Sequence, residues 1–134
     1  MEMKIINWTE VESIVETSFP EEYEMVTQKQ IKAIEQKISD GKPPYVQQQQ
    51  TGGMHVDFGA AINVVAELML ATSIITIWYD VVKPTKEELT YENFQNTLHR
   101  VPQIKDFSTA LLTQEVLRAV ERIFDQIIEA LMQL

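Results

Sequence analysis

The stretch DFGAAINVVAELMLATSIITIWYDVV, residues 57–82, is the longest apolar run in the chain, and the other segments must fold around it. Asp57 is a candidate N-cap, and Pro84 stops the run at its far end. On a helix, Asn63 and Glu67 share one side, while the polar residues of the second half fall on roughly the opposite side. Because no single polar face runs the whole length, we expect a central helix that is wrapped by its neighbours.

Two other interpretations of this stretch remain open. About 20 apolar residues suffice to cross a bilayer, but an acid such as Glu67 near the middle costs about 2.5 kcal/mol or more there. Basic flanks are also missing, so we expect no membrane span. Residues 73–82 are nearly all β-branched or aromatic. An α+β fold with a strand at 73–82 is therefore the alternative to a continuous helix.

Length and composition restrict the class of protein. A chain of 134 residues is long enough for one domain, 1–134, with a core of its own. The absence of cysteine excludes disulfides, thiolate metal sites and a cysteine nucleophile, and it fits a reducing, cytoplasmic setting. Twenty acidic against 11 basic side chains give a net charge of −9, which disfavours nucleic acid and anionic membranes as partners.

Periodicity outside the central run predicts further helices. We expect a short helix capped by Asn7 or Thr9, a helix over 20–39 that ends before Gly41, and a helix from Thr85 to Arg100. The last helix has the clearest pattern, with apolar residues three and four apart at Leu117, Val120, Phe124, Ile127, Leu131 and Leu134. The expected fold is all-α, a compact bundle of about five helices with a buried central hydrophobic helix.

Two segments could serve as connections to other molecules. Residues 42–53, KPPYVQQQQTGG, are predicted to be a long loop, either a plain spacer or a binding loop, with Tyr45 as an apolar anchor. The apolar stripe of the last helix reaches Leu134 and needs a cover. Its own bundle, a second copy, or a continuation of the natural chain would provide one. In the last case, residues 1–134 would be the N-terminal module of a longer protein.

The amino-terminal end is strongly acidic. Residues 1–24 carry seven acids and a single basic residue, Lys4. Such a face either keeps the protein soluble or docks a basic partner. The residues predicted for an interaction surface combine this acidic end with apolar anchors: Glu10, Glu12, Glu16, Glu21, Glu22, Tyr45, Leu131 and Leu134.

No set of residues with a recognisable catalytic spacing is present, so we predict no catalytic residues, no metal and no cofactor. His55 and Asp57 could supply two metal ligands, but a third is not evident nearby. Glu67 is the one acid expected in the interior, with Asn63 one turn before it. Such a buried polar pair either fixes the register of the helices or forms a candidate site.

These observations favour a protein–protein interaction or adaptor module that binds a protein partner or forms a homo-oligomer. An amino-terminal effector-association domain of a signalling or defence protein would be one form of it. Two alternatives belong to other classes. One is a small acidic inhibitor that mimics nucleic acid. The other is a helical enzyme that uses Glu67 with a divalent metal.

Overall fold

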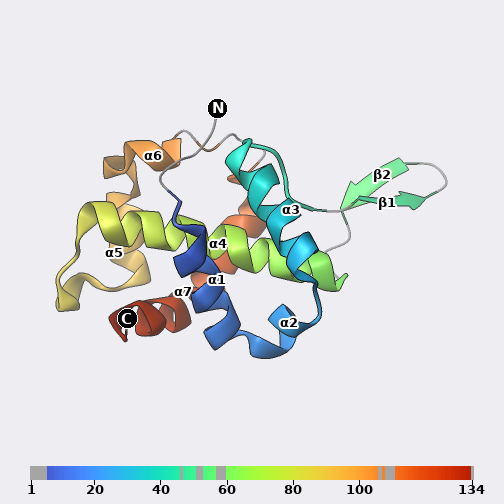
Figure 1. The fold of residues 1–134 in the computed structure, drawn as a ribbon. Helices are drawn as coiled ribbons and strands as arrows, with labels where there is room; N and C mark the ends of the chain where they lie inside the picture. Colours follow the sequence, from blue (N-terminus) through green and yellow to red (C-terminus); the bar gives the residue numbers. More distant parts are fainter. Residues whose placement is uncertain are drawn as a thin grey trace.

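The protein is an all-α bundle arranged around one long helix (Figure 1). The computed structural model describes residues 6–45, 47–50, 53–56, 60–105, 107 and 111–133. The helices in this part of the chain are α1 (Trp8–Ser18), α2 (Pro20–Glu24), α3 (Gln28–Ser39), α4 (Ala61–Val82), α5 (Tyr91–Thr97), α6 (Pro102–Lys105) and α7 (Gln114–Met132). Two 3-10 turns, η1 (Lys86–Glu88) and η2 (Leu98–Arg100), flank α5, and two strands, β1 (Gln47–Gln50) and β2 (Gly53–Val56), form a hairpin.

The central helix α4 confirms the main prediction. It packs against α7 and α1 over most of its length and against α2, α3 and α6 at fewer points. By length and composition α4 could also cross a membrane, and 78% of its most apolar stretch is buried inside the bundle. The alternative of a strand at 73–82 is wrong, because the helix continues to Val82. Burial on all sides outweighs the weak strand preference of its β-branched residues.

Of the three buried hydroxyl side chains of α4, Ser73 and Thr76 find partners on the same helix, whereas Thr72 Oγ1 has no hydrogen-bond partner among the described residues. Ser73 Oγ donates a hydrogen bond of 2.7 Å to the carbonyl oxygen of Leu70, and Thr76 Oγ1 donates one of 3.0 Å to that of Ser73. An unpaired hydroxyl in the core would cost free energy. These local bonds allow polar residues to lie in the fully apolar centre of the bundle.

An aromatic cluster joins the second half of α4 to α5 and α7. Trp78 is completely buried, and its ring centroid lies 5.3 Å from that of Phe94 and 5.8 Å from that of Phe124. The indole Nε1 donates a 2.8 Å hydrogen bond to Thr97 Oγ1, so its polar atom is satisfied. Tyr91 stacks on the edge of this cluster. Large aromatic residues thus tie three helices together.

The prediction of one helix over 20–39 is wrong, because the chain breaks after Glu24 and restarts at Gln28. Thr27 caps α3 through a reciprocal pair of bonds with Gln30: Gln30 N donates to Thr27 Oγ1 (3.1 Å), and Thr27 N donates to Gln30 Oε1 (2.9 Å). This capping box satisfies two backbone amides that an uninterrupted helix would have paired internally. Because the apolar stripe continues across the break, hydrophobic periodicity alone does not indicate that the helix is interrupted.

The expected helix from Thr85 to Arg100 is also interrupted. Thr85 and Glu88 form a capping box, but it caps only the turn η1. Thr90 then caps α5, accepting a 3.1 Å hydrogen bond from Asn93 N. The last expected helix is confirmed as α7, which Thr113 caps.

The long connection before α4 is not a plain loop. β1 and β2 pair antiparallel, with Gln47 opposite Val56 and Gln50 opposite Gly53, so the prediction of a loop over residues 42–53 is wrong where these strands lie. The proposed N-cap Asp57 lies outside the described residues. Ala60 occupies the N-cap position of α4 and makes no side-chain capping bond.

Candidate functional site

A groove along α7 is the candidate functional site, because it combines a concave shape with apolar residues at its base. It consists of two adjoining hollows that share Gln126, with volumes of about 210 Å³ and about 260 Å³. We call this feature the α7 groove, and its lining residues are Thr17, Ser18, Phe19, Glu22, Val64, Leu68, Arg122, Ile123, Gln126, Glu129, Ala130 and Gln133.

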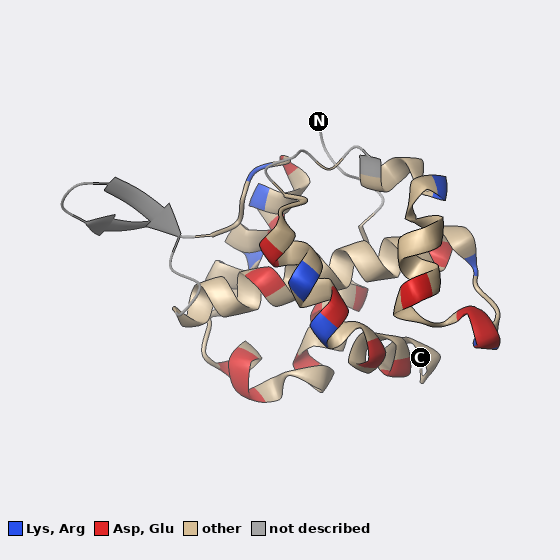
Figure 2. Ribbon diagram, turned by 180° about the vertical axis from the view of Figure 1, so that it is seen from behind, with Lys and Arg blue, Asp and Glu red and all other residues tan. Residues whose placement is uncertain are grey.

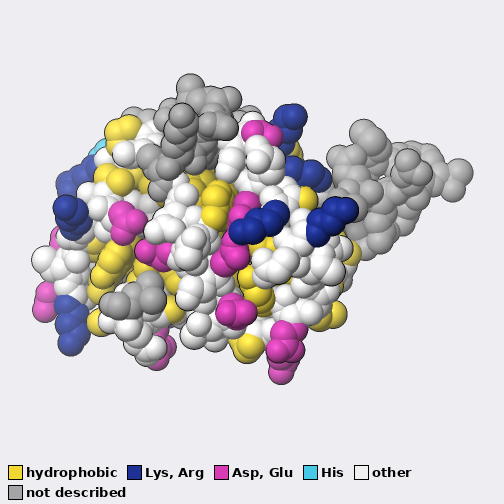
Figure 3. Space-filling view, in the orientation of Figure 1, with side chains coloured by type: hydrophobic (Ala, Val, Ile, Leu, Met, Phe, Trp, Pro, Cys, Tyr) yellow, Lys and Arg dark blue, Asp and Glu magenta, His cyan; other side chains and the backbone are white. Residues whose placement is uncertain are grey.

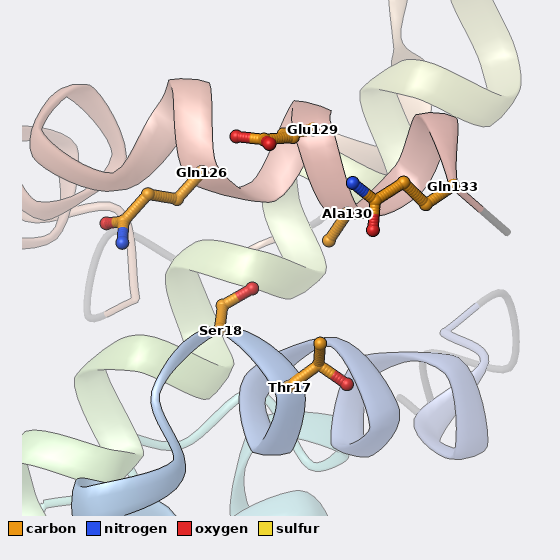
Figure 4. A pocket seen from close by; sticks show the side chains of 6 residues that line it. All are labelled: Thr17, Ser18, Gln126, Glu129, Ala130 and Gln133. Carbon is orange, nitrogen blue, oxygen red and sulfur yellow. The ribbon is translucent and has the colours of Figure 1, made fainter.

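The two long walls of the groove are helical. One wall is the side of α7 from Arg122 to Gln133, and the other is the end of α1 with the start of α2. In Figure 4, Thr17 and Ser18 extend from α1 toward the α7 residues Ala130 and Gln133. At a rise of about 1.5 Å per residue, the α7 wall is about 16 Å long, which is three helical turns.

The floor is apolar and the rim is polar. Leu68 of α4 and Ile123 of α7 are almost completely buried beneath the groove, and Phe19 and Val64 lie partly exposed beside them. Phe19 has this position because α1 ends one residue before it and Pro20 starts α2, which turns the chain. The groove therefore offers apolar contact at its base and polar contact at its edges.

The helices that form the rim carry most of the excess negative charge. α1, α2 and α7 together hold ten acids against two bases, whereas the other residues of the chain hold ten against nine. The ten acids are Glu10, Glu12, Glu16, Glu21, Glu22, Glu24, Glu115, Glu121, Asp125 and Glu129, and the two bases are Arg118 and Arg122. Figure 2 shows the acidic positions of α2 and α7 in red. Most of the net charge of −9 therefore lies on these three helices, and Glu22 and Glu129 are the acids on the groove lining itself.

The predicted polar pair on α4 is located beside this groove. Asn63 is completely buried, as predicted, while the Glu67 side chain retains 14% exposure. Arg122 Nη2 lies 3.9 Å from Glu67 Oε1, and the Arg122 side chain is itself 66% exposed. Burial raises the pKa of Glu67, and the Arg122 guanidinium opposes this shift. The one base on the groove lining is therefore already next to a carboxylate.

Among the acids that the structure describes, Glu35 is the most buried, and no pattern in the sequence predicted this. Glu35 lies on α3 with 6% exposure and faces Glu12 of α1. Lys32 Nζ is 2.8 Å from Glu12 Oε2 and 3.5 Å from Glu35 Oε1, and Tyr23 Oη donates to Glu12 Oε1 at 3.5 Å. Figure 3 shows basic side chains against acidic ones where α1 and α3 meet. The expectation that Glu67 is the interior acid is wrong, since Glu35 is buried more deeply.

The two carboxyls of this cluster have opposite pKa shifts. Burial and the adjacent Glu12 carboxyl raise the pKa of Glu35 to about 8. Hydrogen bonds with Glu35 and Lys32 lower the pKa of Glu12. Protonation of Glu35 is thus favoured to a higher pH than for an ordinary carboxyl, and Lys32 compensates the charge of Glu12. The arrangement links α1 to α3 without contributing to the groove.

The predicted interaction residues do not form one surface. Glu12 is engaged with Lys32, Glu10 lies near Asp80 of α4, and Glu22 lines the groove. Tyr45 and Leu131 are wrong as surface residues because both are buried in the core. Glu16 and Glu21 are exposed, and Leu134 lies outside the described residues.

Within the described residues, no group of three or more His, Asp or Glu side chains is placed to hold a metal ion. The candidate pair His55 and Asp57 cannot be assessed, because the Asp57 position and the His55 side chain lie outside what the structure describes. Comparison with protein-family models, curated proteins and solved structures finds no match to this chain.

Proposed function

We propose that this protein is a protein–protein interaction module and that the α7 groove receives its partner. The observation that carries the proposal is the groove itself, with an apolar floor of Leu68 and Ile123 between two helical walls. Apolar floors with polar rims are typical of surfaces that bind other proteins. The sequence also supports an interaction module, because its acidic amino-terminal end supplies one rim of this groove.

The shape of the groove favours a macromolecule over a small ligand. Each of its hollows is smaller than the roughly 300–1,000 Å³ clefts that enclose small molecules, at about 210 and about 260 Å³. The two hollows extend along the α7 wall instead of deepening into the core. An elongated contact of this kind suits a segment of another chain.

The alternative of a metal-dependent enzyme at Glu67 loses support from its surroundings. A divalent cation at this carboxylate would have to compete with the Arg122 guanidinium at 3.9 Å. The alternative of an acidic inhibitor that mimics nucleic acid accounts for the charge of α1, α2 and α7, but it gives no role to the apolar floor.

Site-specific photocrosslinking tests the proposal. Gln126 at the centre of the groove is replaced by benzoylphenylalanine, and exposed Gln36 on α3 is replaced in the same way as a matched control. In extract of the source cells, we expect a discrete crosslinked protein from position 126 and none from position 36. Identical crosslinking from both positions, or none from position 126, would overturn the proposal. A crosslinked second copy would identify the partner as the protein itself.

A further inference from the structure

We propose that the occupant of the α7 groove is an amphipathic helix with basic flanks. By this we mean a segment with apolar residues at positions i, i+3, i+4 and i+7 and with Lys or Arg beside them. This inference rests on the proposed function and specifies the chemistry of the partner. Three observations support it: the helical walls, the apolar floor and the charge of the rim.

The walls determine the mode of binding. Both are built from helical segments and contain no strand, so they offer no sheet edge to an extended peptide. A helix binds such a groove through side chains alone, with anchors on one of its faces. The α7 wall from Arg122 to Gln133 matches about three turns of a partner helix.

The floor determines what the facing side of the partner must be. Leu68, Ile123, Phe19 and Val64 form an apolar base at one end of the groove, and Ala130 lies at the other end. Ala130 is small, so a partner side chain can approach the α7 backbone there. Leu68 and Ile123 are already almost completely buried, so apolar anchors of a partner would cover mainly the partly exposed Phe19 and Val64.

The rim determines the charge of the flanks. Glu22 and Glu129 line the groove on opposite walls, and Arg122, the one base on the lining, lies close to Glu67. Near Glu22, exposed Glu21 and Glu24 add further negative charge to α2. A partner with Lys or Arg at its flanks would find complementary charge on both sides of the groove.

The same charge argues against a second copy of this chain as the occupant. Symmetric pairing through the α7 groove would bring Glu22 and Glu129 of one copy close to the same two acids of the other. Like charges placed across an interface disfavour association. A basic helix from another protein meets no such repulsion.

Fluorescence anisotropy with synthetic peptides provides the test. The probe is a fluorescein-labelled peptide of about 18 residues, long enough to form a helix, made of Leu, Lys and Gln with Leu at i, i+3, i+4 and i+7. One control has the same composition in scrambled order, and a second has Glu in place of Lys. We expect the probe to bind about tenfold more tightly than either control, and more weakly at about 300 mM than at about 50 mM NaCl.

Two charge-reversal variants locate the binding site. Glu129→Lys changes the rim of the groove, whereas Glu92→Lys makes the same change on exposed α5, outside the groove lining. We expect Glu129→Lys to weaken binding of the probe about fivefold and Glu92→Lys to change it less than about twofold. Both variants have the same net charge, so a difference between them cannot come from overall charge.

Each outcome decides a separate question. Equal binding of the probe and its scrambled control, or equal effects of the two variants, would overturn the inference. If position 126 crosslinks a partner while the peptides fail, the interaction function stands and the basic helix is wrong. If neither a crosslink nor peptide binding is found, both proposals fall.

Discussion

Replacing Glu35 with Gln should remove most of the pH dependence of stability near neutral pH. Glu35 is 6% exposed and faces Glu12 across the contact of α1 with α3. The glutamine has nearly the same shape as the protonated acid and carries no charge at any pH. The substitution therefore separates the packing of this side chain from its ionisation.

The sign of the effect follows from the raised pKa of Glu35. Between its ordinary value of 4.5 and the value of about 8 in the fold, the folded state holds a proton that the unfolded chain releases. The free energy of unfolding therefore decreases as the pH rises through this window. A shift of this size corresponds to about 4–5 kcal/mol if Glu35 titrated alone.

The expected loss is smaller than this limit. Water reaches this cluster, since the Lys32 side chain is 63% exposed, and it screens the repulsion from Glu12 that helps to raise the pKa of Glu35. The lowered pKa of Glu12 has the opposite effect on stability, but only below its ordinary value of 4.5, where its stabilisation is lost on acidification. We expect the protein to lose about 2 kcal/mol between about pH 5.5 and about pH 9.

Urea denaturation followed by tryptophan fluorescence at a series of pH values measures this quantity. Glu35→Gln should unfold at a free energy that is almost independent of pH and should exceed the original protein by about 2 kcal/mol at about pH 9. Glu121→Gln, an exposed control on α7 with the same charge change, should retain the original slope. Parallel pH profiles for Glu35→Gln and the original protein would refute the reasoning.

Three further predictions concern the fold and use the same denaturation assay. Trp78→Ala should lower the free energy of unfolding by about 3–5 kcal/mol, because it empties the aromatic cluster; a loss below about 1 kcal/mol would contradict this packing. Thr27→Ala should cost about 1 kcal/mol by removing the capping box of α3, and no change would argue against that cap. Lys83 has a φ of 50° at the end of α4 and Gly41 a φ of 74° after α3. Lys83→Gly should therefore stabilise the protein by about 0.5–1 kcal/mol and Gly41→Ala destabilise it by about 1 kcal/mol, and a reversed order of the two variants would contradict this backbone argument.

The sequence was sufficient to predict the central helix and the last helix. In both cases a long apolar pattern determines how the helix is buried. α4 is apolar around most of its circumference and must lie inside the bundle, whereas α7 has a single apolar stripe that must face the core. Long, strongly patterned elements of this kind are the most predictable parts of a fold. The β-branched end of α4 remained ambiguous, because helix and strand can bury it equally well.

The residues that break the helix at Thr27 can be recognised in the sequence, although the apolar pattern around them favours one continuous helix. Thr27 and Gln30 have capping-box spacing, yet the apolar stripe continues through Ile31 and suggests one uninterrupted helix. A local capping bond outweighed the pattern there. Every Thr three residues before Gln or Glu should therefore be weighed as a possible helix start, even inside a periodic segment.

The groove and the buried acid could not be predicted in this way. Glu35 is buried because α1 places Glu12 above it, and this contact joins residues 23 positions apart in the chain. The α7 groove likewise depends on the separation of α7 from the turn at Phe19. Both features arise from the relative placement of helices, which periodicity within one helix does not specify.

Hydrogen–deuterium exchange along the chain tests the central claim, that α4 is enclosed by α1, α3 and α7 and thereby forms the floor of the groove. The account predicts that the amides from Val65 to Trp78 exchange most slowly of all, at a rate set by global unfolding. Exchange of these amides as fast as that of the exposed turn at Lys86–Glu88 would contradict it.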